Sequence, residues 1–152
     1  MKDPRDPKDN RAYVISLSRD SMKRDRNYTW VDVIENDKHF FHPVGEGWPD
    51  EPLRYIAFIY DGELQSVHHI ASCRIESDLS AINKNWPKSD TEHVLYKLGP
   101  AKKLPKTVKR GRILDKPCWC AIDTLLSGTY KSVAEAAAET KKRKKMGVTW
   151  IN

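Results

Sequence analysis

A pair of β-type segments joined by Asp61-Gly62 constrains the fold of this chain more than any other feature of its sequence. The stretch is RYIAFIYDGELQSVHHIASCRI, residues 54–75. Asp-Gly is the dipeptide that a two-residue type I′ turn prefers, because both central residues need a positive φ. Residues 55–60 are apolar at every position, which is typical of a central strand covered on both faces. The sequence therefore predicts a long β-hairpin in the middle of a sheet.

The returning strand of the hairpin carries two adjacent histidines, which alternation places on opposite faces. His69 shares the apolar face with Val67 and Ala71, whereas His68 shares a more polar face with Arg74. A histidine on an apolar strand face is more often a hydrogen-bonded core residue than a ligand or a base. The alternative interpretation is that His69 lines a pocket and hydrogen-bonds a polar ligand, while His68 contacts solvent or a phosphate.

Further strands are predicted on both sides of the hairpin by β-type composition and alternation. They cover residues 12–18 and 29–35 before it and residues 93–99 after it. Residues 40–52 contain three prolines and two glycines and predict a long loop, of the kind that often carries function. A short capped helix is expected within residues 78–86.

The last third of the chain is predicted to be helical and to complete an α+β fold. A helix between Pro117 and Gly128 would gather positions 118, 121, 122, 125 and 126 into one apolar stripe. Residues 132–135 have the form of a capping box, and the alanine-rich segment after them has high helix propensity. Strands followed by a helical hairpin indicate a small curved or barrel-like sheet with flanking helices.

Length and composition favour one domain in an intracellular protein. A chain of 152 residues can form one hydrophobic core, and we expect a single domain over residues 12–146. Residues 1–11 are expected to be a disordered lead-in and residues 147–152 a tail. The longest apolar run has six residues and the N-terminus has no apolar signal core, so we expect a soluble cytoplasmic protein without a membrane segment.

The cysteine and histidine pattern predicts neither a metal site nor a cofactor. Cys73, Cys118 and Cys120 are odd in number and CWC is too close for a C-x-x-C pair, so reduced thiols are expected. His39 and His42 lie beside the predicted loop, and no acidic pattern there completes a set of ligands.

Positive charge is concentrated at the end of the chain. Residues 97–152 carry 14 Lys and Arg against 4 Asp and Glu, a net charge of +10, although the whole chain carries only +6. Such a cluster favours a polyanionic partner, nucleic acid before membrane, because each neutralised phosphate releases counterions. The residues predicted to contact phosphates are Lys102, Lys103, Lys106, Lys109, Arg110, Arg112, Lys141, Lys142 and Arg143.

Residues 12–18 followed by the hairpin resemble the PUA-like superfamily, which includes the EVE, ASCH and YTH domains. The likeness spans residues 12–113 and centres on the hairpin, where a strand with an F-x-Y-like end leads through a short turn to the small apolar run in HIASCRI. The resemblance implies a curved, barrel-like sheet that recognises RNA or modified bases, in some members within an aromatic-lined pocket. By position, the residues that we place around such a pocket are Trp30, Trp48, Tyr60 and His69.

The function expected from the sequence is therefore a non-enzymatic nucleic-acid-binding module. The basic last third would contact phosphates, and the aromatic pocket would recognise one flipped or modified base. The first alternative is a small viral or accessory interaction protein that binds a nucleic-acid-processing complex through its basic face. The second is a metal-dependent nuclease, since Asp32, Glu35 and Asp37 form a loose group and Mg²⁺ sites need clustered carboxylates.

Overall fold

The computed structural model describes most of the chain, which forms two compact units. The described residues are 10–18, 21–23, 26–45, 47–49, 53–88, 90–112 and 117–145. Unit 1 comprises residues 1–16, 53–69 and 100–152, and unit 2 comprises residues 17–52 and 70–99. The predicted tail and all but the last two residues of the predicted lead-in lie outside the described ranges, and the prediction of a single domain stays a prediction.

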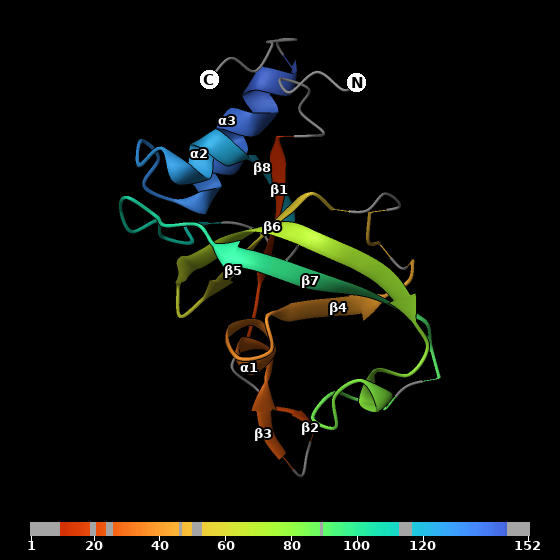
Figure 1. The fold of residues 1–152 in the computed structure, drawn as a ribbon. Coiled ribbons are helices and arrows are strands. Elements are labelled where there is room, and N and C mark those ends of the chain that lie inside the picture. Colours follow the sequence, from red (N-terminus) through yellow and green to blue (C-terminus); the bar gives the residue numbers. More distant parts are fainter. Residues whose placement is uncertain are drawn as a thin grey trace. The chain divides into compact units, whose positions relative to one another are not determined.

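Helices and strands are mixed along the chain (Figure 1). In order they are β1 (Arg11–Ser16), β2 (Ser21–Lys23), β3 (Arg26–Thr29), α1 (Trp30–Glu35), β4 (His39–Pro43), β5 (Tyr55–Tyr60), β6 (Glu63–Glu76), η1 (Leu79–Ala81), β7 (His93–Ala101), β8 (Cys118–Ala121), α2 (Ile122–Leu126) and α3 (Val133–Lys145). The predicted α+β class is confirmed. The strand predicted over residues 93–99 and the short helix, which Asp78 caps, are confirmed as well.

Six of the strands form one mixed sheet, in the order β4-β7-β6-β5-β1-β8, and β2 pairs with β3 separately. β1 runs parallel to β5, whereas β5 is antiparallel to β6, β1 to β8 and β4 to β7. β4 and β8 are the two edges of this order, so the sheet is open in the described part of the chain. The expectation of a barrel-like sheet is therefore wrong.

The central hairpin forms as predicted, with Asp61 and Gly62 at φ values of 57° and 79°. Its two histidines, however, have the opposite environments to those expected. His69 lies on the same face as Val67 but is exposed, whereas His68 is only 4% exposed. The reason is that both faces of β5 are covered, so that the face of His68 is buried too, while His69 lies beyond the end of the core.

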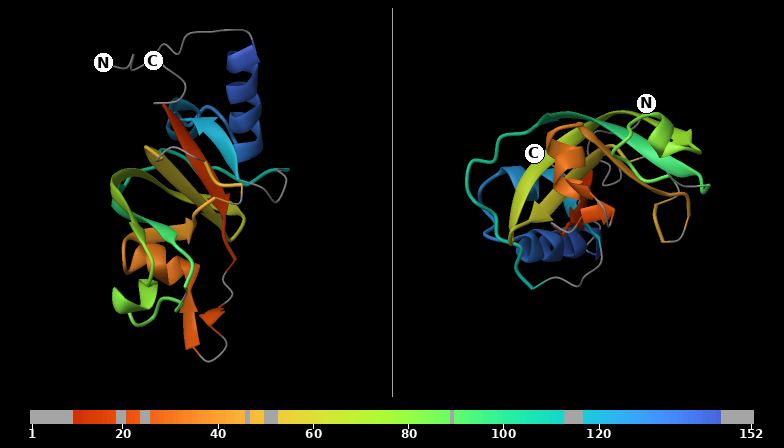
Figure 2. Two further views of the ribbon diagram at one scale, coloured as in Figure 1. Left: turned by 90° about the vertical axis from the view of Figure 1, so that its right-hand side faces the viewer. Right: turned by 90° about the horizontal axis from the view of Figure 1, so that it is seen from below.

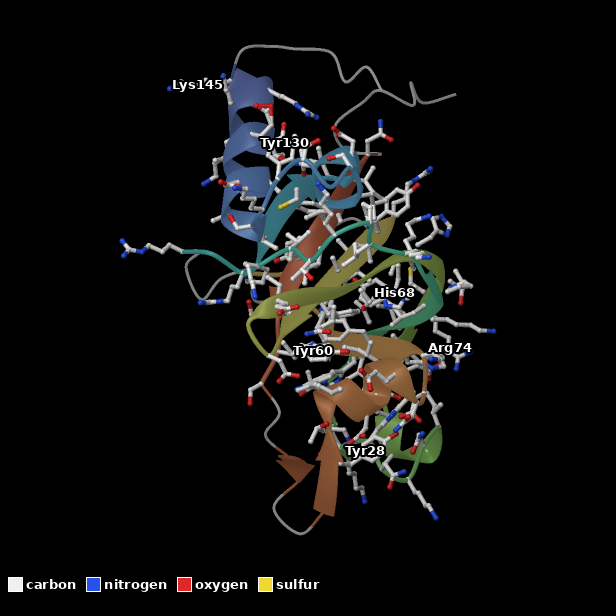
Figure 3. All side chains as sticks on the ribbon, turned by 90° about the vertical axis from the view of Figure 1, so that its left-hand side faces the viewer. Tyr28, Tyr60, His68, Arg74, Tyr130 and Lys145 are labelled. Atoms are coloured by element: carbon white, nitrogen blue, oxygen red, sulfur yellow. The ribbon has the colours of Figure 1, made fainter. Side chains whose placement is uncertain are left out.

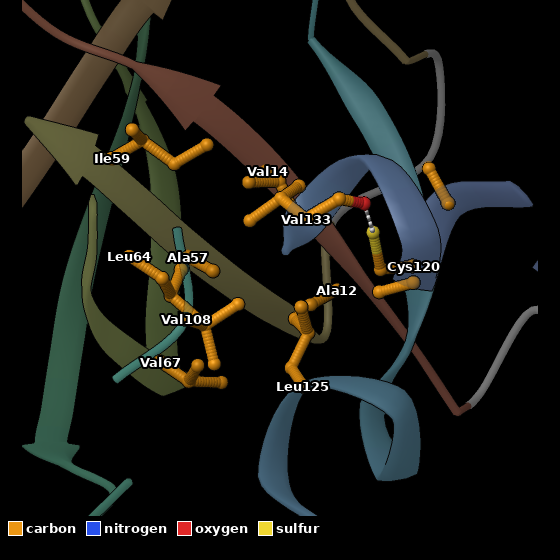
Figure 4. Packing of buried hydrophobic residues seen from close by; sticks show 12 residues of the cluster. Ala12, Val14, Ala57, Ile59, Leu64, Val67, Val108, Cys120, Leu125 and Val133 are labelled. Carbon is orange, nitrogen blue, oxygen red and sulfur yellow. Dashed lines mark hydrogen bonds between the residues drawn. The ribbon is translucent and has the colours of Figure 1, made fainter. Parts of the chain in front are cut away.

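The core of unit 1 lies between one face of its strands and the helices α2 and α3 (Figure 4; two further views of the ribbon are in Figure 2). It includes Ala12 and Val14 of β1, Ala57 and Ile59 of β5, and the buried apolar residues of β6, β8 and α3. Alternate positions of β1, β5 and β8 supply this core, as expected for strands with one face against helices. On β6 the core residues Leu64 and Val67 are three positions apart, because the register with β5 shifts between them.

Residues 29–35 were predicted as a strand, but only Thr29, the last residue of β3, is in one, and residues 30–35 form the helix α1. Thr29 is its N-cap, and a reciprocal capping box joins it to Asp32: the Thr29 hydroxyl accepts from the Asp32 N–H, and the Asp32 carboxylate accepts from the Thr29 N–H at 2.8 Å. The β-branched residues Val31 and Ile34 are buried on this helix. The cap and the burial outweigh the weaker β propensity of valine and isoleucine.

The predicted loop over residues 40–52 begins with a strand. β4 pairs with β7, with Phe41 opposite Leu95, and its consecutive residues Phe40, Phe41 and His42 are all buried. Both faces of this edge strand are thus covered. The glycines that indicated a loop all follow Pro43, the last residue of the strand.

The helix predicted from Pro117 is wrong in its first half. Residues Cys118–Ala121 form β8, in which Cys120 lies opposite Ala12 of β1, and α2 begins only at Ile122. Apolar residues at positions 118 and 120 also share one strand face, so the apolar pattern was compatible with both structures. The predicted stop at Gly128, with a φ of 77°, and the second helix, α3, are confirmed.

Candidate functional site

The basic segment, which we define as residues 102–112, is held along the hairpin by backbone hydrogen bonds within unit 1. The Lys102 N–H donates to the Val67 carbonyl at 2.8 Å, and the Leu64 N–H donates to the Val108 carbonyl at 2.8 Å. The Val108 side chain is buried in the core. The segment is therefore fixed at its start and near its end, although it is not a regular strand.

The same segment also holds the beginning of α3. The Val133 N–H donates to the Lys109 carbonyl at 2.8 Å, and the Lys109 N–H donates to the Lys131 carbonyl at 2.9 Å. Gly111 has a φ of 73°, and a Cβ placed on it would lie 2.8 Å from the Cβ of Ala134. This close approach requires glycine. The first N–H groups of α3 have no partner inside the helix and bond instead to backbone carbonyls of the basic segment. These bonds use only the backbone of the segment and leave its side chains at the surface.

Five of the six cationic side chains of the basic segment are exposed. Lys109 makes an exposed ion pair with Glu63, with 3.2 Å between Nζ and Oε1, and such a pair contributes little, about 0–1 kcal/mol. Arg110 is half-buried. Within the described part of the chain, the remaining four form no ion pair with a carboxylate and are exposed; they are Lys102, Lys103, Lys106 and Arg112.

The predicted phosphate contacts on α3 differ from one another. Lys141 and Lys142 are exposed, and Lys145 lies at the C-terminal end of the helix (Figure 3). Arg143, by contrast, donates two hydrogen bonds to the Asp123 carboxylate of α2, at 2.9 and 3.0 Å, and one to Glu139 at 3.1 Å. Bidentate pairs of this geometry are among the stronger ones. Arg143 thus connects α3 to α2 and is already paired with two carboxylates, and its predicted phosphate contact stays a prediction.

The four residues predicted around a base pocket belong to different units, two in each. Trp30 and Trp48 lie in unit 2, and their rings are 5.2 and 6.0 Å from that of Phe40. Tyr60 and His69 lie in unit 1, where Tyr60 is buried and His69 is exposed. The structure therefore brings the two tryptophans against one shared ring within unit 2.

His42 belongs to the aromatic cluster around Phe40, and sequence reasoning missed its role. Its ring stacks on Trp48 at 4.0 Å with an interplanar angle of 3°. The Pro43 carbonyl lies 2.8 Å from Nδ1, which must therefore donate, and the Tyr96 hydroxyl lies 2.8 Å from Nε2, which then accepts. Burial lowers the pKa of His42 and favours this neutral form. The sequence feature that could have indicated this role is Tyr96, in the strand of residues 93–99, because a buried tyrosine hydroxyl needs a hydrogen-bond partner.

Two of the three carboxylates behind the nuclease alternative serve the fold of unit 2, and the third, Glu35, is exposed. Asp32 caps α1, and the Asp37 carboxylate accepts hydrogen bonds from Tyr28 and from the Trp86 indole N–H, the latter at 2.8 Å. Burial raises the pKa of Tyr28, and the hydrogen bond to Asp37 raises it further. Among the described residues, no group of three or more His, Cys, Asp and Glu could hold a metal ion.

We compared the chain with family models, curated proteins and solved structures. None of them matches.

Two further features bear on function. Ser66 and His68 form a hydrogen-bonded pair on β6, with 2.8 Å between Oγ and Nε2, but they are only 8% and 4% exposed and cannot meet a substrate in this state (Figure 3). None of the described helices has the length and apolar composition that crossing a membrane requires.

Proposed function

We propose that this protein binds nucleic acid through the basic segment and the exposed lysines of α3, without acting on it as an enzyme. The observation that carries the proposal is the fixed basic segment itself. Its backbone is hydrogen-bonded to β6 and to the start of α3, while Lys102, Lys103, Lys106 and Arg112 remain exposed and without a carboxylate partner in the described residues.

A fixed row of cations suits a phosphate backbone for two physical reasons. Each lysine or arginine that contacts a phosphate releases condensed counterions. On duplex DNA, each such contact makes the plot of log binding constant against log salt concentration steeper by about 0.9. The backbone of the segment is already ordered, so that binding has to restrict mainly the side chains. Four such contacts give a slope of about −3.6, a loss of roughly 100-fold or more for a fourfold rise in salt.

PUA-like architecture and recognition of one flipped or modified base are the finer part of the proposal. What supports the architecture is the β5–β6 hairpin with β1 running parallel beside β5, together with the helices that cover one face of unit 1. What supports base recognition is the abundance of aromatic rings around Phe40 in unit 2 and the exposed ring of His69 in unit 1.

The test is a fluorescence-anisotropy titration of labelled DNA and RNA at two salt concentrations. The variant Lys103→Glu with Lys106→Glu reverses two exposed charges of the basic segment and should reduce the salt slope by about 2 in magnitude. The matched control, Lys88→Glu with Lys97→Glu, makes the same charge change at exposed lysines of unit 2.

The proposal expects the first variant to weaken binding strongly and the control to weaken it much less. Equal loss in both variants would show that only net charge matters and would contradict a site at the basic segment. An absence of binding to any nucleic acid at low salt would contradict the proposed function, and an acidic protein surface would become the expected partner of the basic segment.

A further inference from the structure

Beside the basic segment, unit 1 exposes an aromatic pair. Tyr55 of β5 and His69 of β6 are directly opposite each other in the antiparallel register, and their rings meet edge to face, with centroids 5.4 Å apart and an angle of 69°. The ammonium group of Lys102 lies 5.9 Å from the centroid of the Tyr55 ring. We call Tyr55, His69 and Lys102 the rim cluster.

The rim cluster lies where the core of unit 1 ends. Successive cross-strand partners across the sheet run from Cys120 through Ala12 and Tyr55 to His69. The first two are fully buried, Tyr55 is half-buried against the core, and His69 is exposed. The exposed ring of His69 adds little to the core, so its place at the surface does not follow from packing.

His69 also differs from the other four histidines in its hydrogen bonding. Ring nitrogens of the other histidines contact protein partners: the Asp37 carbonyl, the Pro43 carbonyl with the Tyr96 hydroxyl, the Ser66 hydroxyl and the Thr91 carbonyl. Within the described part of the chain, neither nitrogen of His69 has a hydrogen-bond partner. Its ring and both nitrogens are therefore available to a ligand.

Lys102 belongs both to the rim cluster and to the basic segment. Its N–H donates to the Val67 carbonyl, two residues before His69, so the first cation of the basic segment is held next to the aromatic pair. A nucleotide joins a flat base to an anionic phosphate. An exposed ring at the end of a row of lysines matches both parts of it.

We infer, and this inference rests on the proposed function, that the nucleic acid is bound as a single strand. One unpaired base stacks on the exposed ring of His69, beside Tyr55, and a neighbouring phosphate lies at Lys102. A duplex presents its phosphates but keeps the faces of its bases stacked on one another. A side-chain ring can therefore stack only on a base of a single strand, a loop or an end. The rim cluster thus selects the strand state, while the rest of the basic segment supplies affinity for any backbone.

The experiment compares a single-stranded oligonucleotide with the duplex of the same sequence, as DNA and as RNA, by anisotropy at two salt concentrations. The wild-type chain should bind the single strand more tightly. His69→Ala should weaken single-strand binding about 5-fold to 150-fold, the range expected for one lost base stack, and should leave duplex binding and the salt slope unchanged. His69→Phe keeps a flat ring at this position and should retain most of the preference.

The outcomes separate this inference from the proposed function. Salt-dependent binding without a single-strand preference, or a preference that His69→Ala does not change, would overturn the rim cluster as a base site and leave phosphate binding intact. A loss in His69→Phe as large as in His69→Ala would overturn stacking as the cause. If neither strand state binds at low salt, both proposals fail.

Discussion

His42 combines stacking, hydrogen bonding and burial in a single side chain. It is only 3% exposed, stacks on Trp48 and bridges the Pro43 carbonyl to the Tyr96 hydroxyl. The residue type was noticed in the sequence only as a candidate metal ligand. Its actual partner, Tyr96, is distant in the chain, and a pairing of that kind cannot be read from local spacing.

The buried imidazole of His42 predicts a pH dependence of stability. Its pKa in the folded protein is lowered from the ordinary 6.5 by burial and by nearby His93, so below about pH 6.5 the unfolded chain binds a proton that the folded chain does not. Stability is therefore fully present above that pH and falls as the pH decreases towards the folded pKa. We expect urea denaturation of His42→Gln to show a smaller loss of stability than the wild type between about pH 7.5 and pH 5.5.

The same variant should also be less stable than the wild type at about pH 7.5, by about 1–3 kcal/mol, because the stacked ring is lost and the Tyr96 hydroxyl loses a well-placed acceptor. His69→Gln is the matched control, since it removes a histidine from an exposed position. A pH profile of His42→Gln that is parallel to the wild-type profile would contradict the role given to His42.

At the scale of elements, the signals in the sequence succeeded where a turn or a cap was explicit. Asp61-Gly62 predicted the central hairpin, and the alanine-rich segment predicted α3. The sequence misled where local propensity and tertiary contacts disagree. Residues 30–35 are rich in valine and isoleucine yet form a helix, because Thr29 caps them and the helix buries its apolar side. Ser132 accepts from the Glu135 N–H as predicted, but the Glu135 carboxylate accepts from the N–H of Lys131, because the basic segment lies against this turn.

The contact between the basic segment and α3 predicts a specific sensitivity of Gly111. In Gly111→Ala the new methyl group would lie 2.8 Å from the Cβ of Ala134, on a backbone whose φ of 73° is already unfavourable for alanine. We expect a loss of stability of about 2–5 kcal/mol, the sum of left-handed strain and overpacking. Gly62→Ala is the control, because its φ of 79° is similar and no atom lies within 4 Å of its new Cβ.

The control should therefore lose only the strain, about 1–2 kcal/mol. Equal destabilisation of the two variants in urea denaturation would show that the basic segment does not pack closely on α3. This measurement also bears on function, since the fixed backbone of the basic segment is what orders the cations of the proposed interface.

At the scale of the whole molecule, the sequence predicted the class of the fold but not its topology. The parallel pairing of β1 with β5 joins residues separated by more than a quarter of the chain, with Tyr13 opposite Ile56, and no local pattern encodes such a register. The division into two units follows from contacts between segments that are interleaved along the chain. For the candidate site, the exposed cations were predictable from charge clustering, whereas the rim cluster required the register of β5 and β6.

The three cysteines provide a test of this arrangement, because they lie at different depths. Cys73 is exposed in unit 2, while in unit 1 Cys118 is half-buried and Cys120 is fully buried. A hydrogen bond with Cys118 and burial raise the pKa of Cys120, which keeps its thiol protonated and unreactive, and the same hydrogen bond lowers the pKa of Cys118.

We expect a soluble thiol reagent to modify Cys73 first, Cys118 more slowly, and Cys120 only when unit 1 opens. Cys73→Ser should remove the fast phase alone and leave the slowest phase, whose rate should rise with denaturant as unit 1 unfolds. Three thiols that react at one rate without denaturant would contradict the burial of β8 against α3, on which the positions of the basic segment and of α3 both depend.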